Sequence, residues 1–297
     1  MSKIVECVPN FSEGIRTDVI DLIANAFKSI EGCKVLDVKP DKDHNRTVYT
    51  IIGEPQAVKA GLLAAIAAAI KHIDLNNHKG EHPRLGACDV APFIPIKEMS
   101  MEDCITLSRE TAQEVWERFL IPVYYYEEST LIQGRANLAD IRKGEFEVLK
   151  TEIALPHRKP DVGEPKMHPT AGAIVIGARK PLIAYNVNLN TSDLSVAKAI
   201  AKRMRSKTGG LTYVKALGVM LSERNIAQVS MNLTDFSKSA VYTVFEMVKM
   251  EAQRYGVGVL GSEVIGLVPL EALVEAGRYY LQLEDFQTSQ ILETHLI

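Results

Sequence analysis

The sequence is poor in features that mark several large classes of protein. It has only four cysteines in 297 residues and no C-x-x-C pair, which argues against a disulfide framework or a cysteine-based zinc site. The formal net charge is −3 and no basic block occurs, so nucleic acid is not an expected partner. No apolar run is long enough to span a bilayer, and the first residues lack the apolar stretch of a secretory signal. We therefore expect a cytoplasmic protein with free thiols and no membrane contact.

What is present is a regular alternation of strand-like and helix-like segments. The hydrophobic fraction of 46% supports a substantial core. Each half of the chain follows the order β-α-β-β-α-β, with segments at 4–8, 19–30, 34–38, 47–52, 55–73 and 88–96, and then at 182–189, 193–204, 215–221, 227–233, 238–255 and 257–261.

This order is typical of the ferredoxin-like unit, an antiparallel sheet with helices on one face. We therefore predict an α+β protein, an α/β sandwich built from two ferredoxin-like βαββαβ subdomains with mainly antiparallel sheets. The predicted subdomains are residues 1–178 and 179–297, joined within 167–179.

Two proline-containing segments admit more than one interpretation. Pro92 and Pro95 in the segment 88–96 suit a strand at a sheet edge or the end of a strand. The segment 154–173, "ALPHRKPDVGEPKMHPTAGA", is rich in proline, glycine and charge, as surface linkers are. The same composition suits a ligand loop in a crevice between subdomains, and both interpretations stay open.

Two motifs match known fingerprints in form only. Residues 78–82 spell H-x-x-E-H, but a zinc site needs both histidines on one helix face, and Gly80 and Pro83 are turn residues. Residues 256–261 spell G-x-G-x-x-G, but they follow a predicted helix, so the glycines are expected to end that helix and begin a strand. Neither a metal nor a nucleotide is therefore expected. No G-x-S-x-G motif supports a serine nucleophile.

His82 remains as the candidate for chemistry. It lies in "GEHPRLGACD", residues 80–89, beside Arg84 and Asp89. Pro83 and Gly86 restrict this loop to particular conformations, and it connects a helix end to a strand start. The alternative interpretation is a solvated loop histidine without a role.

Six blocks of the sequence resemble the glutamate formimidoyltransferase family. They are "VECVPNFSEG" (5–14), "NRTVYT" (45–50), "GEHPRLGACDVAPFIPI" (80–96), "HPTAGA" (168–173), "GAR" (177–179) and "GSEVIGLVP" (261–269). The resemblance runs nearly the whole length of the chain, and the length is similar to that of the stand-alone bacterial form. The animal form joins this part to a second enzyme.

The resemblance implies transfer of a formimidoyl group from N-formimidoyl-L-glutamate to N5 of tetrahydrofolate, late in histidine degradation. It also implies a homodimer whose two subdomains, 1–178 and 179–297, are the N- and C-terminal formimidoyltransferase subdomains. Tetrahydrofolate is then a co-substrate, with no metal and no nucleotide. The family's catalytic histidine falls on His82. Its folate-binding segment falls on Gly163, Glu164, Pro165, Lys166, Met167, His168, Pro169, Thr170, Ala171 and Gly172.

The implied chemistry explains a histidine. One proton must leave N5 and one must reach the departing nitrogen of glutamate, and an imidazole with a pKa near 6.5 can do both near neutral pH. The animal members carry an acidic residue at the position of Lys39. Asp41, Asp43 and Asp89 are therefore the candidates for a carboxylate that orients the ring.

Both substrates carry carboxylates, so cations are expected to converge on them. The candidates are Arg46, Arg84, Lys166 and Arg179, whereas Asn10, Asn45 and Asn188 could hydrogen-bond the pterin or the amidine. Two other functions stay open. One is a formyltransferase that uses 5-formyltetrahydrofolate and glutamate, and the other is a folate-binding protein without turnover.

Overall fold

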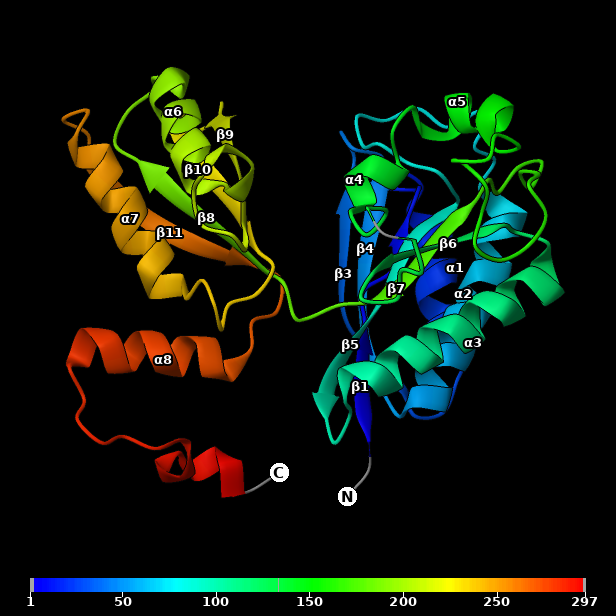
Figure 1. Ribbon diagram of the computed structural model, residues 1–297, viewed down its shortest axis with the longest axis horizontal. Coiled ribbons are helices and arrows are strands. Elements are labelled where there is room, and N and C mark those ends of the chain that lie inside the picture. Colours follow the sequence, from blue (N-terminus) through cyan, green and yellow to red (C-terminus); the bar gives the residue numbers. More distant parts are fainter. Residues whose placement is uncertain (1–2, 133, 296–297) are drawn as a thin grey trace. The chain divides into compact units, whose positions relative to one another are not determined.

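The computed structural model describes residues 3–132 and 134–295 (Figure 1). The chain divides into two compact units, Met1–Arg179 and Lys180–Ile297, which we call unit 1 and unit 2 and describe separately. Unit 1 contains a mixed sheet and unit 2 an antiparallel sheet. The prediction of an α+β protein is therefore confirmed.

Apart from the two-residue strand β2, unit 1 begins with the predicted β-α-β-β-α-β order. It then continues with further elements. The elements are β1 (Ile4–Cys7), β2 (Asn10–Phe11), α1 (Thr17–Lys28), β3 (Cys33–Asp41), β4 (Arg46–Gly53), α2 (Pro55–His72), β5 (Cys88–Lys97), α3 (Met101–Phe119), β6 (Val123–Glu127), α4 (Leu138–Ile141), α5 (Glu145–Glu152) and β7 (Ile174–Ala178).

The sheet of unit 1 is mixed, so the prediction of mainly antiparallel sheets is confirmed only in part. β3, β4, β1, β2 and β5 pair antiparallel, but β7 pairs parallel to both β5 and β6. The parallel part arises because α3 and the segment with α4 and α5 are crossover connections, and a crossover returns the chain in the same direction. The sequence pattern gave no sign of these added elements.

The two faces of the unit 1 sheet have separate apolar clusters. α1, α2 and α3 pack with alternate strand residues such as Ala91 and Ile176 in one large core. The neighbouring residues Val90 and Val175 point to the opposite face, where they pack with Ile141 from α4 and Leu149 from α5. This second cluster fixes the segment that follows α4 close to the start of β5.

β5 is an interior strand at Pro92, so the prediction of an edge or a strand end is wrong there, whereas Pro95 lies near the end of β5, beyond its pairing with β7. It pairs with β1 and β2 on one side and with β7 on the other. A proline lacks only the amide donor, and the carbonyl group of Pro92 still accepts a hydrogen bond from the amide of Val8 at 3.3 Å.

Unit 2 has the order β-α-β-β-α-β, followed by a third α-helix. Its elements are β8 (Ile183–Leu189), α6 (Leu194–Met204), β9 (Val214–Leu221), β10 (Ile226–Leu233), α7 (Val241–Gln253), β11 (Val259–Ile265) and α8 (Leu270–Leu281), with short 3₁₀ turns at Ser206–Thr208, Thr288–Gln290 and Leu292–His295. The strand order is β11-β8-β10-β9, with every pair antiparallel. α6 and α7 pack on one face of this sheet (Figure 1).

The G-x-G-x-x-G run at residues 256–261 has the predicted structural role. Gly256 adopts a positive φ of 68° just after α7, and β11 begins at Val259. The four cysteines are buried free thiols, as predicted. Among the described residues, no helix combines the length and the apolar character needed to cross a membrane.

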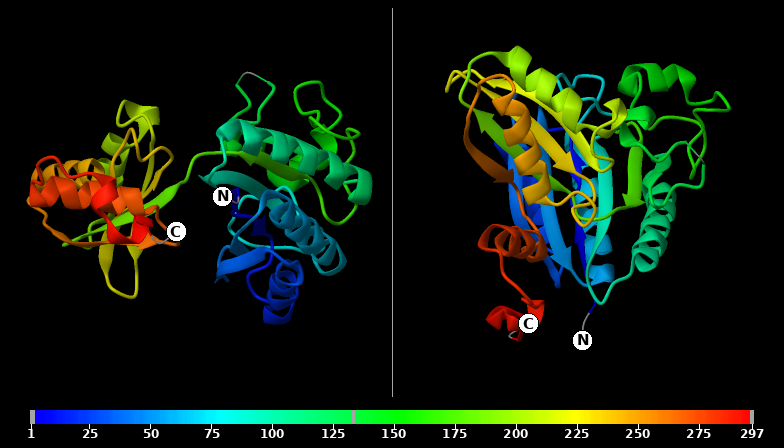
Figure 2. Two further views of the ribbon diagram at one scale, coloured as in Figure 1. Left: turned by 90° about the horizontal axis from the view of Figure 1, so that it is seen from below. Right: turned by 60° about the vertical axis from the view of Figure 1, so that its left-hand side comes forward.

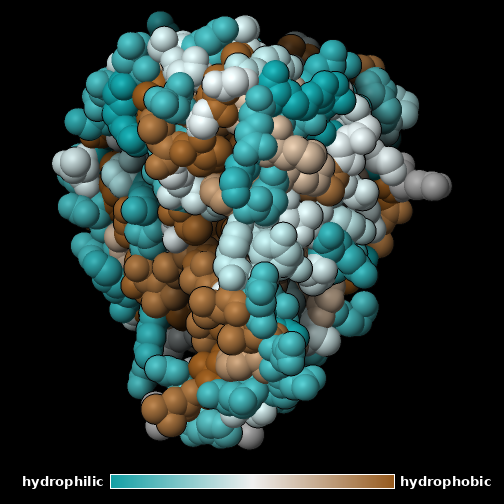
Figure 3. Space-filling model, turned by 90° about the vertical axis from the view of Figure 1, so that its left-hand side faces the viewer, coloured by the Kyte–Doolittle hydropathy of each residue, from teal (hydrophilic) through white to brown (hydrophobic). Residues whose placement is uncertain are grey.

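The last part of unit 2 exposes apolar side chains. α8 and the 3₁₀ turns after it are drawn in red in Figure 2. Leu270, Leu273 and Leu281 of α8 are exposed, and Ala272 is the one buried residue of this helix. Figure 3 shows apolar atoms gathered in the lower part of the view, where α8 lies.

Candidate active site

His82 lies in a non-helical loop that precedes β5. The nearby Arg84 side chain is buried and fastens this loop to α5. Its guanidinium group donates to Glu147 Oε1 at 2.7 Å and to Glu145 Oε2 at 2.9 Å, and its Nε donates to Nδ1 of His78 at 3.2 Å. The conformation around His82 is therefore set by charge-assisted hydrogen bonds.

The H-x-x-E-H run does not form a zinc motif in this fold. Residues 78–82 are not helical, so its two histidines do not share a helix face. Both ring nitrogens of His78 are occupied, since Nε2 lies 2.9 Å from the carbonyl oxygen of Asn45 and Nδ1 accepts from Arg84. No group of three or more His, Cys, Asp or Glu side chains that could hold a metal ion occurs in the described part of the chain.

The loop with His82 is paired to the predicted folate segment. The amide of Ala87 donates to the carbonyl of Ala171 at 2.9 Å, and the amide of Ala173 donates to the carbonyl of Leu85 at 3.0 Å. Further back, the amide of Leu75 donates to the carbonyl of Thr170 at 2.9 Å. The structure therefore brings together two segments that lie about 80 residues apart in the sequence.

Two glycines allow this close approach. Gly86 and Gly172 form an isolated antiparallel bridge. A Cβ atom on Gly86 would lie 1.9 Å from the carbonyl oxygen of Ala173, and one on Gly172 would lie 2.2 Å from that of Leu85. Gly172 also has a φ of 72°, which glycine adopts without strain.

The predicted folate segment is held by local contacts within unit 1. Nδ1 of His168 accepts from the amides of Thr170 at 3.3 Å and Ala171 at 3.0 Å, which closes a tight turn. Gly163 has a φ of 96° and lies against the Trp116 ring, so no side chain fits there. Part of 154–173 thus packs into unit 1 and is no free linker.

The turn between β3 and β4 lies against the loop that carries His82. The amide of Glu81 donates to the carbonyl of Asp43 at 3.2 Å, and a Cβ atom on Gly80 would lie 2.4 Å from the carbonyl oxygen of His44. Within the turn, Asp41 Oδ1 accepts from the amide of His44 at 3.0 Å, and Asp41 Oδ2 lies 2.8 Å from His44 Nδ1. The ring centroids of His44 and His82 are 6.2 Å apart.

His82 is an imidazole held in its neutral form. Burial lowers its pKa to about 3, and the nearby charges of Arg46, Arg142 and His44 act in the same direction, against a weaker opposing effect of Asp41. Its Nε2 is buried and has no hydrogen-bond partner among the described residues. A neutral imidazole has one ring nitrogen with a lone pair that can accept a proton.

None of the three candidate carboxylates hydrogen-bonds to His82 within residues 3–132 and 134–295. Asp41 is bonded to His44. Asp89 is buried, accepts from the amide of Leu85 at 2.7 Å, and pairs with Arg142.

The five arginines and lysines of interest fall into different environments. Arg46 and Arg142 lie near His82, and the Nε atom of each is buried without a partner in the described ranges. Arg84 is committed to α5, and the Lys166 side chain is exposed. Arg179 donates its amide to the carbonyl of Phe93, five residues along β5 from Cys88, which places it roughly 16 Å from the start of that strand.

The three candidate asparagines also differ. Asn10 accepts from Arg46 at 3.3 Å and so borders the site. Asn45 has a left-handed φ of 46°, and its side chain is used within the fold by the amide of Gly14 and the carbonyl of Lys79. Asn188 belongs to unit 2, where its side chain accepts from Gln228 at 2.9 Å.

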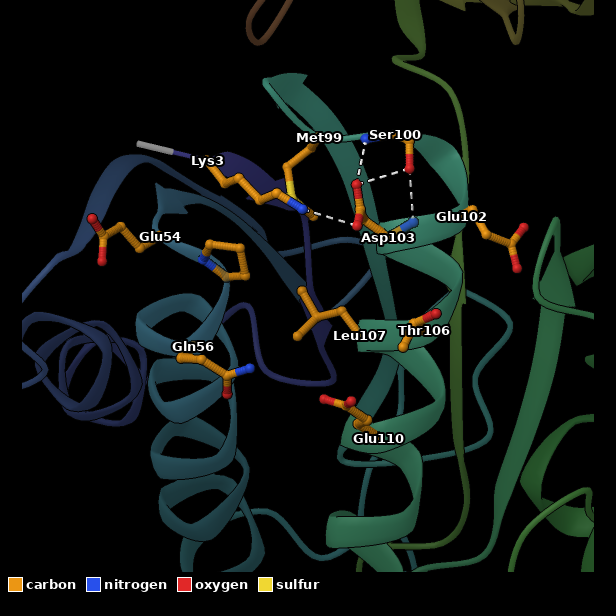
Figure 4. A pocket seen from close by; sticks show the side chains of 11 residues that line it. Lys3, Glu54, Gln56, Met99, Ser100, Glu102, Asp103, Thr106, Leu107 and Glu110 are labelled. Carbon is orange, nitrogen blue, oxygen red and sulfur yellow. Dashed lines mark hydrogen bonds and ion pairs between the residues drawn. The ribbon is translucent and has the colours of Figure 1, made fainter. Parts of the chain in front are cut away.

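A separate hollow of unit 1 contains none of the predicted site residues. It lies where α2 and α3 begin, and Lys3, Gln56, Asp103 and Leu107 are among the residues that line it (Figure 4). An ion pair between Lys3 and Asp103, at 3.0 Å, lies at its edge. A smaller hollow includes Asn45 and His78, on one side of the loop that carries His82.

Sequence reasoning missed two residues of the site. His44 lies in the polar turn "KPDKDHNR". The available signal in the sequence was an aspartate three residues before it, Asp41, which contacts His44 in the structure. Arg142 follows the short helix α4, and no local pattern marks it. Only the pairing of β5 with β7 and the cluster under α4 bring Arg142 to Asp89.

Comparisons with known proteins agree across the whole chain. Residues 4–179 match the family "Formiminotransferase domain, N-terminal subdomain", and residues 184–297 match "Formiminotransferase domain". The chain is 48% identical to the glutamate formimidoyltransferase of Streptococcus pyogenes serotype M1 over 100% of both chains. It is 47% identical to that of Thermoplasma acidophilum over 98% of this chain and 96% of the relative. It is 44% identical to the formimidoyltransferase-cyclodeaminase of Mus musculus, of which it spans 53%.

Proposed function

The chain belongs to the formiminotransferase family, and we propose that His82 carries out the proton transfer of its reaction. Its activity is that of a glutamate formimidoyltransferase in histidine degradation, with tetrahydrofolate as co-substrate. The formimidoyl group passes from N-formimidoyl-L-glutamate to N5 of tetrahydrofolate. The observation that carries the assignment of His82 is its unpartnered, neutral imidazole beside two arginines and a loop paired to the folate segment.

The chemistry begins when N5 attacks the amidine carbon and forms a tetrahedral adduct. N5 becomes positively charged in this adduct and must lose its proton. His82 Nε2 is the acceptor, since it is neutral and has no competing hydrogen bond among the described residues. General base catalysis of this type is worth about 10² to 10⁴ in rate.

Arg46 and Arg142 are proposed to bind a carboxylate of the formimidoyl donor. Each has a buried Nε atom with no partner in the described part of the chain, and Asn10 lies against Arg46. An anion bound there also opposes the charges of Arg46 and Arg142, which help to lower the pKa of His82. Binding of the donor therefore makes His82 a stronger base at the moment when a proton must be removed.

The segment Gly163–Gly172 is proposed to bind the folate. Its support is the backbone pairing of 171–173 with 85–87, which holds the segment beside the loop that carries His82. Lys166, exposed within this segment, is proposed to bind a carboxylate of the glutamate tail. Arg84, Arg179, Asn45 and Asn188 remain predictions as substrate contacts.

A direct assay separates this function from the two alternatives. Purified protein is incubated with N-formimidoyl-L-glutamate and tetrahydrofolate, and formation of 5-formimidoyltetrahydrofolate is followed by absorbance. We expect turnover. Transfer only from 5-formyltetrahydrofolate to glutamate would identify a formyltransferase, and tight folate binding without either reaction would identify a binding protein.

Several broader properties complete the proposal. The strand order of unit 2 supports a ferredoxin-like subdomain, and the antiparallel part of unit 1 follows the same order. We take units 1 and 2 as the N- and C-terminal formimidoyltransferase subdomains, with 178/179 as the predicted boundary. Buried free thiols support a cytoplasmic enzyme, and exposed apolar side chains on α8 support a homodimer.

A further inference from the structure

The proposed reaction requires two proton transfers at one carbon. N5 of tetrahydrofolate loses a proton when its bond to the amidine carbon forms. The nitrogen of glutamate gains a proton when its bond to that carbon breaks. A single imidazole must rotate or shift between the two nitrogens, whereas two groups on opposite sides of the adduct avoid that movement.

His44 is the second imidazole near this position. Its ring centroid is 6.2 Å from that of His82, and the two ring planes are inclined by 67°. The two imidazoles are therefore close enough in space to face the same bound adduct, each toward one of its nitrogens.

Asp41 fixes the orientation of His44. Oδ2 of Asp41 lies 2.8 Å from His44 Nδ1, and Oδ1 accepts from the His44 amide at 3.0 Å. Burial acts to raise the pKa of Asp41, but the hydrogen bonds and charge of His44 outweigh burial and lower it. Asp41 is therefore an ionised partner for Nδ1, and Nε2 is the His44 atom that exchanges protons with a ligand.

The surroundings of the two histidines differ in the way that an acid and a base require. His82 is half-buried and surrounded by the cations Arg46 and Arg142. The His44 side chain is 44% exposed and has a carboxylate partner. Cations favour the neutral form of the His82 ring, whereas the His44 ring has a carboxylate within hydrogen-bond distance of Nδ1.

We propose that His44, held by Asp41, is a second catalytic residue that protonates the departing nitrogen of glutamate. In the complete step, the N5–C bond forms, the C–N bond to glutamate breaks, His82 accepts the N5 proton and His44 donates one. A proton then passes from His82 to His44, directly or through solvent, and both rings return to their starting states. The inference rests on the proposed function.

Three variants of the full chain test this role. His44→Gln removes the exchangeable proton, and Asp41→Asn keeps an acceptor for the His44 amide while it removes the charge. His157→Gln changes an exposed histidine in the same unit and is the control. Each is assayed for kcat, KM for both substrates, the pH dependence of kcat, and thermal unfolding.

We expect His44→Gln to lower kcat by a factor of about 10² or more, with each KM changed less than about threefold and thermal unfolding unchanged. The pH dependence of kcat should also change shape, because the proposed general acid is removed while His82, Asp41, Arg46 and Arg142 are all retained. Asp41→Asn should lose less activity than His44→Gln, and His157→Gln should match the wild type.

Two results would overturn the role of His44. One is a His44→Gln variant that keeps kcat within about threefold of the wild type. The other is a loss of kcat with the pH dependence of kcat unchanged in shape, which would assign His44 a structural role in the turn. Failure of the proposed function itself would be distinct, since the wild-type protein would then show no formimidoyl transfer.

Discussion

Free imidazole side chains titrate near neutral pH, and both the burial of His82 and its neighbouring arginines move it away from that range. A base with a pKa of about 3 is available at every physiological pH but is weak. In the proposed mechanism, a substrate carboxylate bound by Arg46 and Arg142 would raise the pKa of His82. The reactive state would then be formed by the donor together with the enzyme, and not by the enzyme alone.

His82→Gln is expected to abolish catalysis while folate still binds. Glutamine fills a similar volume but cannot accept and release a proton, so kcat should fall by a factor of about 10² to 10⁴. Binding of folinate, followed by calorimetry, should stay within a few-fold of the wild type. Activity retained within about tenfold would remove His82 from the mechanism.

The same residue should make stability depend on pH. The pKa of His82 is lowered from 6.5 to about 3 in the folded state, so the unfolded chain binds more protons between these values. The free energy of unfolding therefore falls as pH falls from 6.5 toward 3, and the contribution is fully present above 6.5.

In His82→Gln this contribution is absent. The loss of unfolding free energy between about pH 7 and pH 4.5, measured by urea denaturation, should be smaller than in the wild type by on the order of 1–2 kcal/mol. The exposed His157→Gln control should follow the wild type. Equal pH dependence in wild type and His82→Gln would contradict the lowered pKa.

Among the elements, the loop before β5 and the loop before β7 are built as a pair. Neither loop has regular structure, yet each provides the hydrogen-bond partners that the other needs. The requirement for glycine at Gly86 and Gly172 is a consequence of this pairing, because each Cβ position is already occupied by a carbonyl oxygen of the opposite loop.

Gly86→Ala should separate the two loops. The added methyl group meets backbone that cannot give way cheaply, so we expect a thermal destabilisation of about 2 kcal/mol or more and weaker folate binding. Gly258→Ala is the matched control, since nothing lies within 4 Å of its Cβ position. Differential scanning fluorimetry with and without folinate gives both quantities, and equal behaviour of the two variants would refute the pairing.

The sequence predicts those parts of the site that a local pattern carries. The loop with His82 was marked by Pro83 and Gly86, and the strand after it by its apolar run. Arg142, one of the two arginines near His82, was not predictable in this way, because it reaches the site only through the fold of the added segment that contains α4. Likewise, Asp89 was a candidate from proximity in sequence, but its side chain faces Arg142.

At the level of the whole molecule, alternating hydrophobicity was sufficient to predict the segments of both β-α-β-β-α-β patterns within a few residues. It was insufficient for residues 101–178. There β6 and β7 extend the sheet with parallel strands, and α3, α4 and α5 lie in the connections between strands. A buried parallel strand such as β7, five residues in length, has no alternation to detect.

Chelators should leave the enzyme unaffected. The reaction proposed here uses imidazoles and guanidinium groups, and the motif that imitates a zinc site has both nitrogens of His78 engaged. Activity measured after dialysis against EDTA should equal that of the untreated protein. A loss that added zinc restores would return H-x-x-E-H to consideration.

The paired loops have a thermodynamic consequence for how each substrate affects the binding of the other. Any molecule that stabilises 163–172 also restricts 85–87, and hence the connection to His82, because the same hydrogen bonds join them. Linkage then requires reciprocity: folate and the amidine donor should each increase the affinity of the enzyme for the other by the same factor. Amide hydrogens on both loops should accordingly become protected from exchange together when either substrate alone is added.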